Sequence, residues 1–300
     1  MLTHTPGFTR HLLAMLLCSG FSLSMAADRL TVYSVNYPLQ YFAQRIAGEH
    51  ADVVLPVPGD VDPAFWEPPV ETVIDYQQAD LVLLNGAGYA RWTGSVSLPP
   101  SRLVDTSAAF SDAYMTVAAA TVHSHGPGGD HSHTGTAFTT WLDFSQAVSQ
   151  ANAIREALTR KRPQLAGKFE RSYIGLKKDL LALDQSLRAV VTANKELPLL
   201  ASHPVYQYLA RRYALNLRSV MWEPGQLPAE AEWAALEQML ETHPANYMLW
   251  EGEPLQETVT RLEALGIHSI VFEPAGNRPE QGDFMTVMKR NIGNLATAYE

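Results

Sequence analysis

The sequence predicts an α/β protein in which two parallel-sheet α/β lobes are joined by one long rigid helix. Short runs rich in Val, Leu and Ile alternate with helical patterns in both halves of the chain, and this alternation is typical of βαβ units and parallel sheets. An uninterrupted helical pattern over 164–196 separates the halves. The length of 300 residues also suits about two domains.

The first stretch of the chain reads as a secretory signal. Arg10 precedes an apolar run that ends in small residues near Ala26, so we expect a signal peptide over 1–26 and export to the periplasm. The run is shorter than the ~20 residues that a membrane-spanning helix needs, and the mature protein is not expected to be membrane-embedded. Because Cys18, the only cysteine, lies within this signal, the mature protein is expected to have none, and any metal must be held by His, Asp or Glu.

Strands are expected in both lobes. The N-terminal lobe, 27–163, has candidate strands at 30–35, 52–57, 80–85, 102–105 and 115–120. The C-terminal lobe, 197–300, has candidates at 197–202, 217–221, 247–251 and 269–273.

The linking helix is predicted by leucines at helical spacing and by the absence of proline between Pro163 and Pro198. Leu176, Leu180, Leu183 and Leu187 recur at intervals of three or four, which places them on one helix face. A single rigid helix between two α/β lobes would hold them facing each other, as in a binding protein.

One segment, 123–135, interrupts these patterns and is rich in histidine. Its glycines and Pro127 predict an exposed, mobile loop without regular structure. Neutral imidazole suits zinc, copper and nickel, so a loop of this composition can collect metal. Alternatively, the loop is a solvated polar segment whose histidines are incidental. The four candidate ligands are His123, His125, His131 and His133.

A second group of candidate ligands follows the strands of the C-terminal lobe. His203 comes directly after one predicted strand, and Glu251 and Glu273 lie at the ends of two others. Ligands of open parallel sheets bind outside the carboxyl ends of the strands, so these side chains could converge on one cleft. Alternatively, His203 serves the turn or helix start at Pro204. For Glu251, a solvated carboxylate is the favoured interpretation.

Charge and motifs limit the possible functions. The net charge of -9, from 22 basic and 31 acidic residues, argues against nucleic acid as a partner and favours cations. No G-x-S-x-G elbow, H-E-x-x-H motif or phosphate-binding glycine loop is present. The sequence therefore predicts binding and not catalysis.

Several blocks, in order from about Leu30 to the C-terminus, resemble the zinc- and manganese-specific solute-binding proteins of bacterial ABC transporters. Asp62-Pro63 and Trp66-Glu67-Pro68 are similar to that family's D-P-H-x-x-E-P block. The segment from His203 to Tyr213 is similar to its H-x-A-F-x-Y-F-A-x-R-Y segment. Trp141-Leu142-Asp143 resembles the W-L-D that follows its His-rich loop. The resemblance, to the TroA-like, high-affinity zinc uptake type, implies a cluster A-I fold, a monomer, an ABC permease partner and Zn2+, Mn2+ or another divalent transition metal as cargo.

The resemblance also implies a degenerate metal site. The family holds its metal with three histidines and a carboxylate, and here Ala64 and Thr139 stand where the first two histidines would be. His203 fits the third histidine and Glu273 fits the carboxylate. Neither alanine nor a threonine methyl is a good zinc ligand, so the usual four-coordinate site cannot form.

Three explanations remain open. Zinc is bound by His203 and Glu273, with loop histidines or water completing the site. Alternatively, the cleft takes a chelated metal or another small solute. In the third explanation the cleft is vestigial, and the His-rich loop acts as a zinc chaperone or buffer. A metal-dependent hydrolase using His203 and Glu273 is the remaining alternative. The apolar walls expected for a solute site are Trp66, Tyr37 and Trp222.

Overall fold

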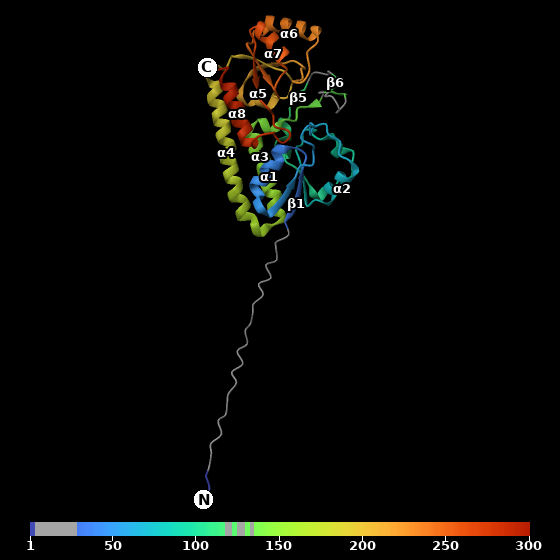
Figure 1. Cartoon of the computed structure of the whole chain (residues 1–300), viewed down its shortest axis with the longest axis vertical. Coiled ribbons are helices and arrows are strands. Elements are labelled where there is room, and N and C mark those ends of the chain that lie inside the picture. The colour runs from blue at the N-terminus through green and yellow to red at the C-terminus, as the bar shows by residue number, and fades with distance from the viewer. Residues whose placement is uncertain (4–28, 118–121, 125–129, 133–134) are drawn as a thin grey trace.

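A computed structural model describes residues 1–3, 29–117, 122–124, 130–132 and 135–300. Two α/β lobes are stacked end to end, and the long helix α4, Ala166–Thr192, runs along the side of both (Figure 1). The predicted fold class is therefore confirmed.

Each lobe contains a four-stranded, all-parallel sheet with the same connectivity. The N-terminal sheet has the order β2-β1-β3-β4 and the C-terminal sheet the order β10-β9-β11-β12. In each sheet the second strand lies on one side of the first strand, and the third and fourth strands lie on the other side. This reversal creates a topological switch point beside β1 in one sheet and beside β9 in the other. The strands are β1 Leu30–Ser34, β2 Ala51–Val54, β3 Leu81–Leu84, β4 Leu103–Asp105, β9 Pro198–Ala201, β10 Asn216–Ser219, β11 Tyr247–Trp250 and β12 His268–Val271.

Helices and short 3-10 turns connect these strands. The α-helices besides α4 are α1 Tyr37–Ala47, α2 Val70–Gln78, α3 Phe144–Lys161, α5 Gln207–Tyr213, α6 Glu230–Thr242, α7 Gln256–Ala264 and α8 Phe284–Ala296. The 3-10 turns are η1 Gly48–His50, η2 Arg91–Gly94, η3 Pro100–Arg102, η4 Ala108–Ala113, η6 Thr140–Leu142 and η7 Pro163–Leu165.

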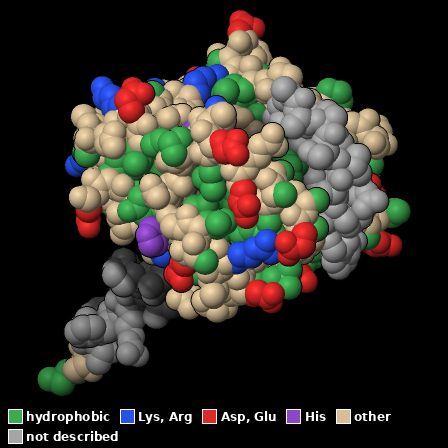
Figure 2. Space-filling view, turned by 90° about the horizontal axis from the view of Figure 1, so that it is seen from above, with side chains coloured by type: hydrophobic (Ala, Val, Ile, Leu, Met, Phe, Trp, Pro, Cys, Tyr) green, Lys and Arg blue, Asp and Glu red, His purple; other side chains and the backbone are tan. Residues whose placement is uncertain are grey.

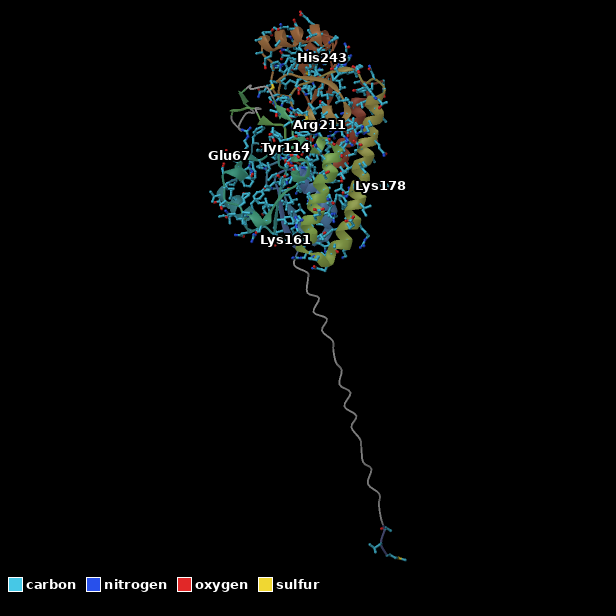
Figure 3. The ribbon with its side chains drawn as sticks, turned by 180° about the vertical axis from the view of Figure 1, so that it is seen from behind. Glu67, Tyr114, Lys161, Lys178, Arg211 and His243 are labelled. Atoms are coloured by element: carbon cyan, nitrogen blue, oxygen red, sulfur yellow. The ribbon has the colours of Figure 1, made fainter. Side chains whose placement is uncertain are left out.

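The linking helix lies within the predicted range and shares one core with both lobes. Leu176, Leu180 and Leu187 are fully buried on one face of α4. A single apolar cluster joins this face to residues of both sheets and of α8. Lys161 at the end of α3 and His243 in the C-terminal lobe lie towards opposite ends of the folded part of the chain, and Lys178 on α4 lies between those two levels (Figure 3). The helix is therefore a packed part of the body and not an exposed tether.

Two predictions for the segment after η4 need correction. The candidate strand 115–120 is described as far as Val117, and there β5, Thr116–Val117, pairs antiparallel with β8, Gly135–Thr136, and not with the parallel sheet. Regular structure is also present in the His-rich segment, where β6, Val122–Ser124, pairs antiparallel with β7, Asp130–Ser132. A glycine-rich connection suits a hairpin as well as it suits an irregular loop, so glycines alone could not distinguish the two.

The face seen from above carries acidic side chains that are scattered among apolar ones and do not form a single patch (Figure 2). Among the helices within the described residues, none has the length and apolar character needed to cross a membrane.

Candidate functional site

A cavity of about 310 Å³ lies where residues of both lobes meet. The C-terminal lobe contributes residues that follow β9, β11 and β12, and the N-terminal lobe contributes residues from the loops after β2 and β3 and from the approach to η6. The carboxyl end of a parallel sheet at its switch point is where α/β proteins bind ligands. The side chains on which the chemistry depends are Asp62, Phe65, Tyr89, Phe138, Thr139, Trp141, His203, Glu251 and Glu273.

His203, just beyond β9, is the histidine of this cavity and is only 2% exposed. Its Nδ1 lies 2.9 Å from Glu251 Oε1, and its Nε2 lies 3.7 Å from Glu223 Oε1. Burial by itself would lower the pKa of His203, but the hydrogen bond and charge of Glu251, and the charges of Glu223 and Asp62, raise that pKa above its ordinary value. The carboxylates near both ring nitrogens stabilise the imidazolium form relative to the neutral imidazole.

Of the two alternative roles for His203, the turn is present and the helix cap is not. The His203 carbonyl accepts a hydrogen bond from the Val205 N–H at 2.9 Å, which makes the turn through the backbone. Helix α5 begins at Gln207 without a side-chain cap. The imidazole itself is part of the cavity lining.

Glu251 differs from its favoured interpretation as a solvated carboxylate. Its side chain is 23% exposed and pairs with His203. The residue before it, Trp250, is fully buried in the outer core of the C-terminal lobe, and this burial fixes the end of β11.

Glu223 was missed by the sequence analysis, although a signal for it exists. A buried aromatic residue precedes a glutamate three times in this lobe, at Trp222-Glu223, Trp250-Glu251 and Phe272-Glu273. Each pair lies at or just beyond the carboxyl end of a strand of the same sheet. The aromatic residue anchors the strand end, and the glutamate is brought to the edge of the sheet where the site lies.

Glu273 reaches the cavity as predicted, but its carboxylate already has a partner. Oε2 accepts a hydrogen bond from an Arg290 side-chain N–H at 2.8 Å, and the side chain is 29% exposed. Burial raises the pKa of Glu273, and the Arg290 guanidinium opposes this without cancelling it. His203, Glu251 and Glu273 therefore share one cavity, but His203 pairs with Glu251.

The two positions that the family would fill with histidine carry no metal donor of their own. Ala64 is buried, and its backbone N–H donates to Asp62 Oδ1 at 2.8 Å. The Thr139 hydroxyl donates to the Val205 carbonyl. Within the described part of the chain, no group of three or more His, Cys, Asp or Glu side chains is arranged to hold a metal ion. The described residues alone therefore do not form a complete set of metal ligands.

The apolar walls of the cavity differ from the expected ones. Trp222 is 3% exposed and packs against Trp233 in the outer core, and neither Trp66 nor Tyr37 is among the described residues that line the cavity. The walls are formed instead by Phe65, Tyr89, Phe138 and Trp141.

A buried polar hub positions the N-terminal wall. Asn85, which follows β3, donates through Nδ2 to the Phe138 carbonyl at 2.9 Å. Its Oδ1 accepts from Asn36 Nδ2 at 3.2 Å and from Gln150 Nε2 at 3.1 Å. The hub joins the ends of β1 and β3 to α3 and holds Phe138 at the cavity.

The loop 274–280 of the C-terminal lobe is fastened to the N-terminal lobe. Arg278 donates to the Leu55 carbonyl at 2.6 Å and to the Val57 carbonyl at 2.7 Å. Asn277 Nδ2 donates to the carbonyls of Pro58 and Val61 at 2.6 and 2.8 Å. We call this pair of residues the interlobe clasp.

Of the His-rich candidates, His123 and His131 are placed only by their backbone, as opposite residues of β6 and β7. His125 and His133 lie outside the described residues. Whether any of the four contributes to the cavity stays a prediction.

Comparison with known proteins gives a family match over almost the entire chain. The family model described as ZnuA, zinc-uptake complex component A periplasmic, matches residues 32–298. This family is one of solute-binding proteins and not of enzymes, in agreement with the sequence prediction.

Relatives with similar sequences carry names that refer to zinc. The zinc-binding lipoprotein AdcA of Streptococcus pneumoniae serotype 4 is 23% identical over 295 residues, which cover 95% of this chain and 58% of AdcA. The high-affinity zinc uptake system protein ZnuA of Bacillus subtilis strain 168 is 24% identical over 291 residues, covering 91% of this chain and 89% of that protein. This chain thus spans little more than half the length of AdcA.

Solved structures show the same fold at low sequence identity. The Zn(II)-bound ZnuA-like domain of Streptococcus pneumoniae AdcA has a TM-score of 0.76 at 19% identity, covering 90% of this chain and 98% of that one. FpvC of Pseudomonas aeruginosa in complex with Mn2+ has a TM-score of 0.72 at 21% identity, with 90% and 98% covered. Together with the family match over 32–298, the two lobes and their shared cavity show that this chain belongs to the ZnuA family of periplasmic zinc-uptake components.

Proposed function

We propose that this protein is the periplasmic solute-binding component of an ABC transporter for a divalent transition metal, zinc above all. It carries its cargo in the interlobe cavity and delivers it to the membrane permease. The observation that carries this proposal is His203, a buried imidazole at the switch point of the C-terminal sheet, held by a carboxylate on one ring nitrogen.

The pairing of His203 with Glu251 resembles the support that metal-binding histidines usually have. Such a histidine donates its second ring N–H to a carboxylate, which sets the tautomer and orients the ring. Glu251, 2.9 Å from Nδ1, can play that role, and Nε2 becomes the metal ligand by exchanging its contact with Glu223 Oε1, 3.7 Å away, for the metal. Zinc binding then displaces a proton from the imidazole.

Glu273 is the second protein ligand in this proposal. It becomes a ligand by exchanging its hydrogen bond with Arg290 for the metal. Loop histidines or water complete the coordination. Imidazole and carboxylate donors suit zinc and also accept manganese and nickel, which agrees with the Mn2+-bound and Ni2+-bound structures of FpvC.

A second candidate function is a periplasmic zinc chaperone or buffer that acts through the His-rich segment, with a vestigial cleft. The antiparallel register of β6 and β7 favours it, because it places His123 and His131 opposite each other. A metal-dependent hydrolase is disfavoured by the family match.

Zinc titration by calorimetry distinguishes these functions. The purified protein is compared with His203→Ala, with a variant whose residues 122–134 are replaced by a Gly-Ser linker, and with His268→Ala as a control at an exposed strand position. We expect His203→Ala to weaken zinc binding at least about tenfold, while the linker variant and the control retain the tight site.

In the opposite pattern, the linker variant loses tight zinc binding and His203→Ala retains it. That result would refute metal transport in the cavity and support the buffer function of the His-rich segment. Equal zinc binding by all variants would mean that neither region holds the metal.

A further inference from the structure

We infer that the cavity receives its metal together with a small organic chelator that carries a net positive charge, so that the chelator completes the coordination that the protein leaves open. This inference rests on the proposed function. Size, wall chemistry, an unpartnered hydroxyl and charge each support it.

The cavity is too large for a bare ion. Its volume of about 310 Å³ is at the lower end of the range of small-molecule sites, about 300–1,000 Å³. One water molecule occupies about 30 Å³ in the liquid, so a lone metal ion would leave most of the space to solvent.

The walls suit an organic molecule. Phe138 packs edge-to-face against Phe65 and Tyr89, with ring centroids 6.1 and 5.2 Å apart. Tyr89 packs in the same manner against Trp141 at 5.8 Å. A hydrated ion gains nothing from such a surface, whereas the body of a chelator gains from covering it.

The Tyr89 hydroxyl needs a partner. Tyr89 is 7% exposed, and its hydroxyl oxygen is buried without a hydrogen-bond partner among the described residues. A β-carbon added at Gly276 would lie 3.5 Å from this oxygen, so the hydroxyl lies at the junction of the two lobes. Since buried polar groups are almost always paired, and burial keeps this phenol protonated by raising its pKa, the hydroxyl is suited to donate to a ligand oxygen.

The charges around the cavity select a cation. Asp62, Glu251, Glu273 and Glu280 line it, against Arg278 and His203. The Arg278 guanidinium is directed at the Leu55 and Val57 carbonyls. A zinc complex that keeps positive charge is therefore favoured over one whose chelator reverses the charge.

The described residues supply few donors that are not already engaged. Ala64 has none, and the Thr139 hydroxyl is bonded to Val205. Among the lining carboxylates, Asp62 Oδ1 accepts the Ala64 N–H and Glu251 pairs with His203, so His203 and Glu273 are the two ligands of the proposed function. Zinc is usually four-coordinate, so a chelator with amine, imidazole or carboxylate donors supplies the rest, and one of its carboxylate oxygens accepts the Tyr89 hydrogen bond.

Calorimetry at buffered, matched free zinc tests this inference with three probes: zinc alone, zinc with L-histidine and zinc with citrate. L-Histidine leaves its 1:1 zinc complex positively charged, and citrate makes the complex negative. We expect L-histidine to strengthen zinc binding at least about tenfold, citrate to give no strengthening, and native mass spectrometry to show one protein, one zinc and one histidine.

The variant that identifies the site is Tyr89→Phe, with Tyr247→Phe on β11, outside the cavity lining, as the matched control. Tyr89→Phe removes one oxygen and keeps the ring wall. It should abolish the strengthening by histidine, whereas Tyr247→Phe should retain it, and the melting temperatures of both variants show whether they fold like the parent protein.

Four results would overturn the inference. In the first, zinc alone binds through His203 and histidine adds nothing at matched free zinc; the proposed metal carrier then stands without a chelator. In the second, citrate strengthens binding as much as histidine does. In the third, histidine binds equally well without zinc. In the fourth, Tyr89→Phe keeps the full effect of histidine. Absence of zinc binding with and without histidine would instead refute the proposed function itself.

Discussion

At the scale of single residues, His203 determines how the cavity responds to pH. Carboxylates near both ring nitrogens raise its pKa above the ordinary value of 6.5. A proton and a metal ion compete for the same imidazole. The raised pKa therefore extends this competition to higher pH than for an ordinary histidine.

We predict that zinc affinity falls as the pH is lowered through the raised pKa of His203, beginning above pH 6.5. The fall should approach about tenfold per pH unit, because one proton is released for each metal bound. Calorimetry in buffers of different ionisation enthalpy measures that proton directly. His203→Ala should show weaker binding with a shallower pH dependence, and an unchanged slope would exclude His203 as the titrating ligand.

The titration of His203 also affects the stability of the metal-free protein, and this pH dependence has the opposite direction from that of zinc affinity. The folded-state pKa of His203 is raised, so its stabilising contribution is complete below about pH 6.5 and is lost as the pH rises through the folded value. Metal binding reverses this trend, because only the deprotonated imidazole binds zinc.

Glu251 is predicted to be the residue that orients His203. Glu251→Gln removes the charge and weakens the 2.9 Å contact with Nδ1, so zinc affinity near pH 8 should fall about 10–100-fold. The pH profile should also move to lower pH, because the pKa of His203 returns towards its ordinary value. Glu253→Gln, at an exposed position two residues away, is the control, and an equal effect in both variants would contradict the assignment.

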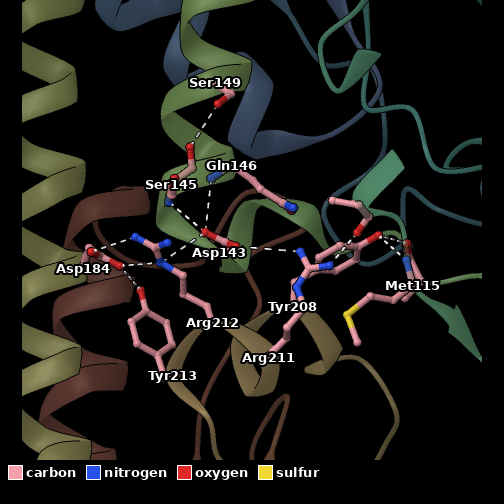
Figure 4. Close-up of polar contacts among 12 residues, drawn as sticks. Met115, Asp143, Ser145, Gln146, Ser149, Asp184, Tyr208, Arg211, Arg212 and Tyr213 are labelled. Carbon is pink, nitrogen blue, oxygen red and sulfur yellow. Dashed lines mark hydrogen bonds and ion pairs between the residues drawn. The ribbon is translucent and has the colours of Figure 1, made fainter. Parts of the chain in front are cut away.

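At the scale of elements, Asp184 connects the linking helix to the rest of the molecule. Its Oδ1 accepts from Arg212 Nε at 3.0 Å and from the Tyr213 hydroxyl at 2.9 Å, and its Oδ2 accepts from Arg188 Nε at 3.1 Å. Arg212 Nε also lies 3.4 Å from Asp143 Oδ1. Asp143 caps the start of α3, so one network joins α4, α5 and α3 (Figure 4).

We predict that Asp184→Asn destabilises the protein by about 1–3 kcal/mol at pH 7, because three donors lose a charged acceptor. Burial would raise the pKa of Asp184, but hydrogen bonds from Arg212, Tyr213 and Arg188 lower it below 3.8. The stabilisation is therefore present above about pH 3.8 and lost as the pH falls through the folded pKa.

Urea unfolding at several pH values measures this difference, which should shrink in acid. Asp179→Asn serves as the control, because its ion pair with Arg45 is more exposed and such pairs contribute about 0–1 kcal/mol. A constant difference between pH 7 and the acid end would contradict the role of the Asp184 charge.

At the scale of the whole molecule, the interlobe clasp closes the cavity. Asn277 and Arg278 donate four hydrogen bonds to carbonyls of the N-terminal lobe, at Leu55, Val57, Pro58 and Val61. The helices α4 and α8 share one apolar core with both lobes. The same loop also accepts hydrogen bonds from the Trp141 indole N–H at Pro274 and from the Tyr37 backbone N–H at Gly276, so the clasp is one part of a polar seam beside the cavity.

We predict that the double variant Asn277→Ala and Arg278→Ala releases zinc at least about tenfold faster, because hydrogen bonds that close the site are lost. Its radius of gyration by small-angle scattering should increase, and its melting temperature should fall only slightly. Arg218→Ala, which loses an exposed hydrogen bond to Thr242, is the control. Release and scattering identical to those of the parent protein would mean that the clasp does not gate the cavity.

The sequence by itself determined the architecture. Apolar runs of strand length and a leucine face over 164–196 are local patterns, and burial of those patterns permits few arrangements. The two sheets and α4 followed from them, with ends that differ by a few residues. His203 could also be found, because a strand end is recognisable in the sequence.

Only the tertiary structure decided the chemistry of the site. Tyr89 and Phe138 are far from His203 in the chain, and no local pattern predicts that these residues meet. Antiparallel pairing of β6 with β7 and of β5 with β8 likewise depends on long-range register. Packing placed His203 beside Glu251 and Glu223, directed Glu273 to Arg290, and left the Tyr89 hydroxyl without a described partner. The physical reason is that folding brings distant charges together in a poorly solvated space, where each neighbour changes what the others can bind.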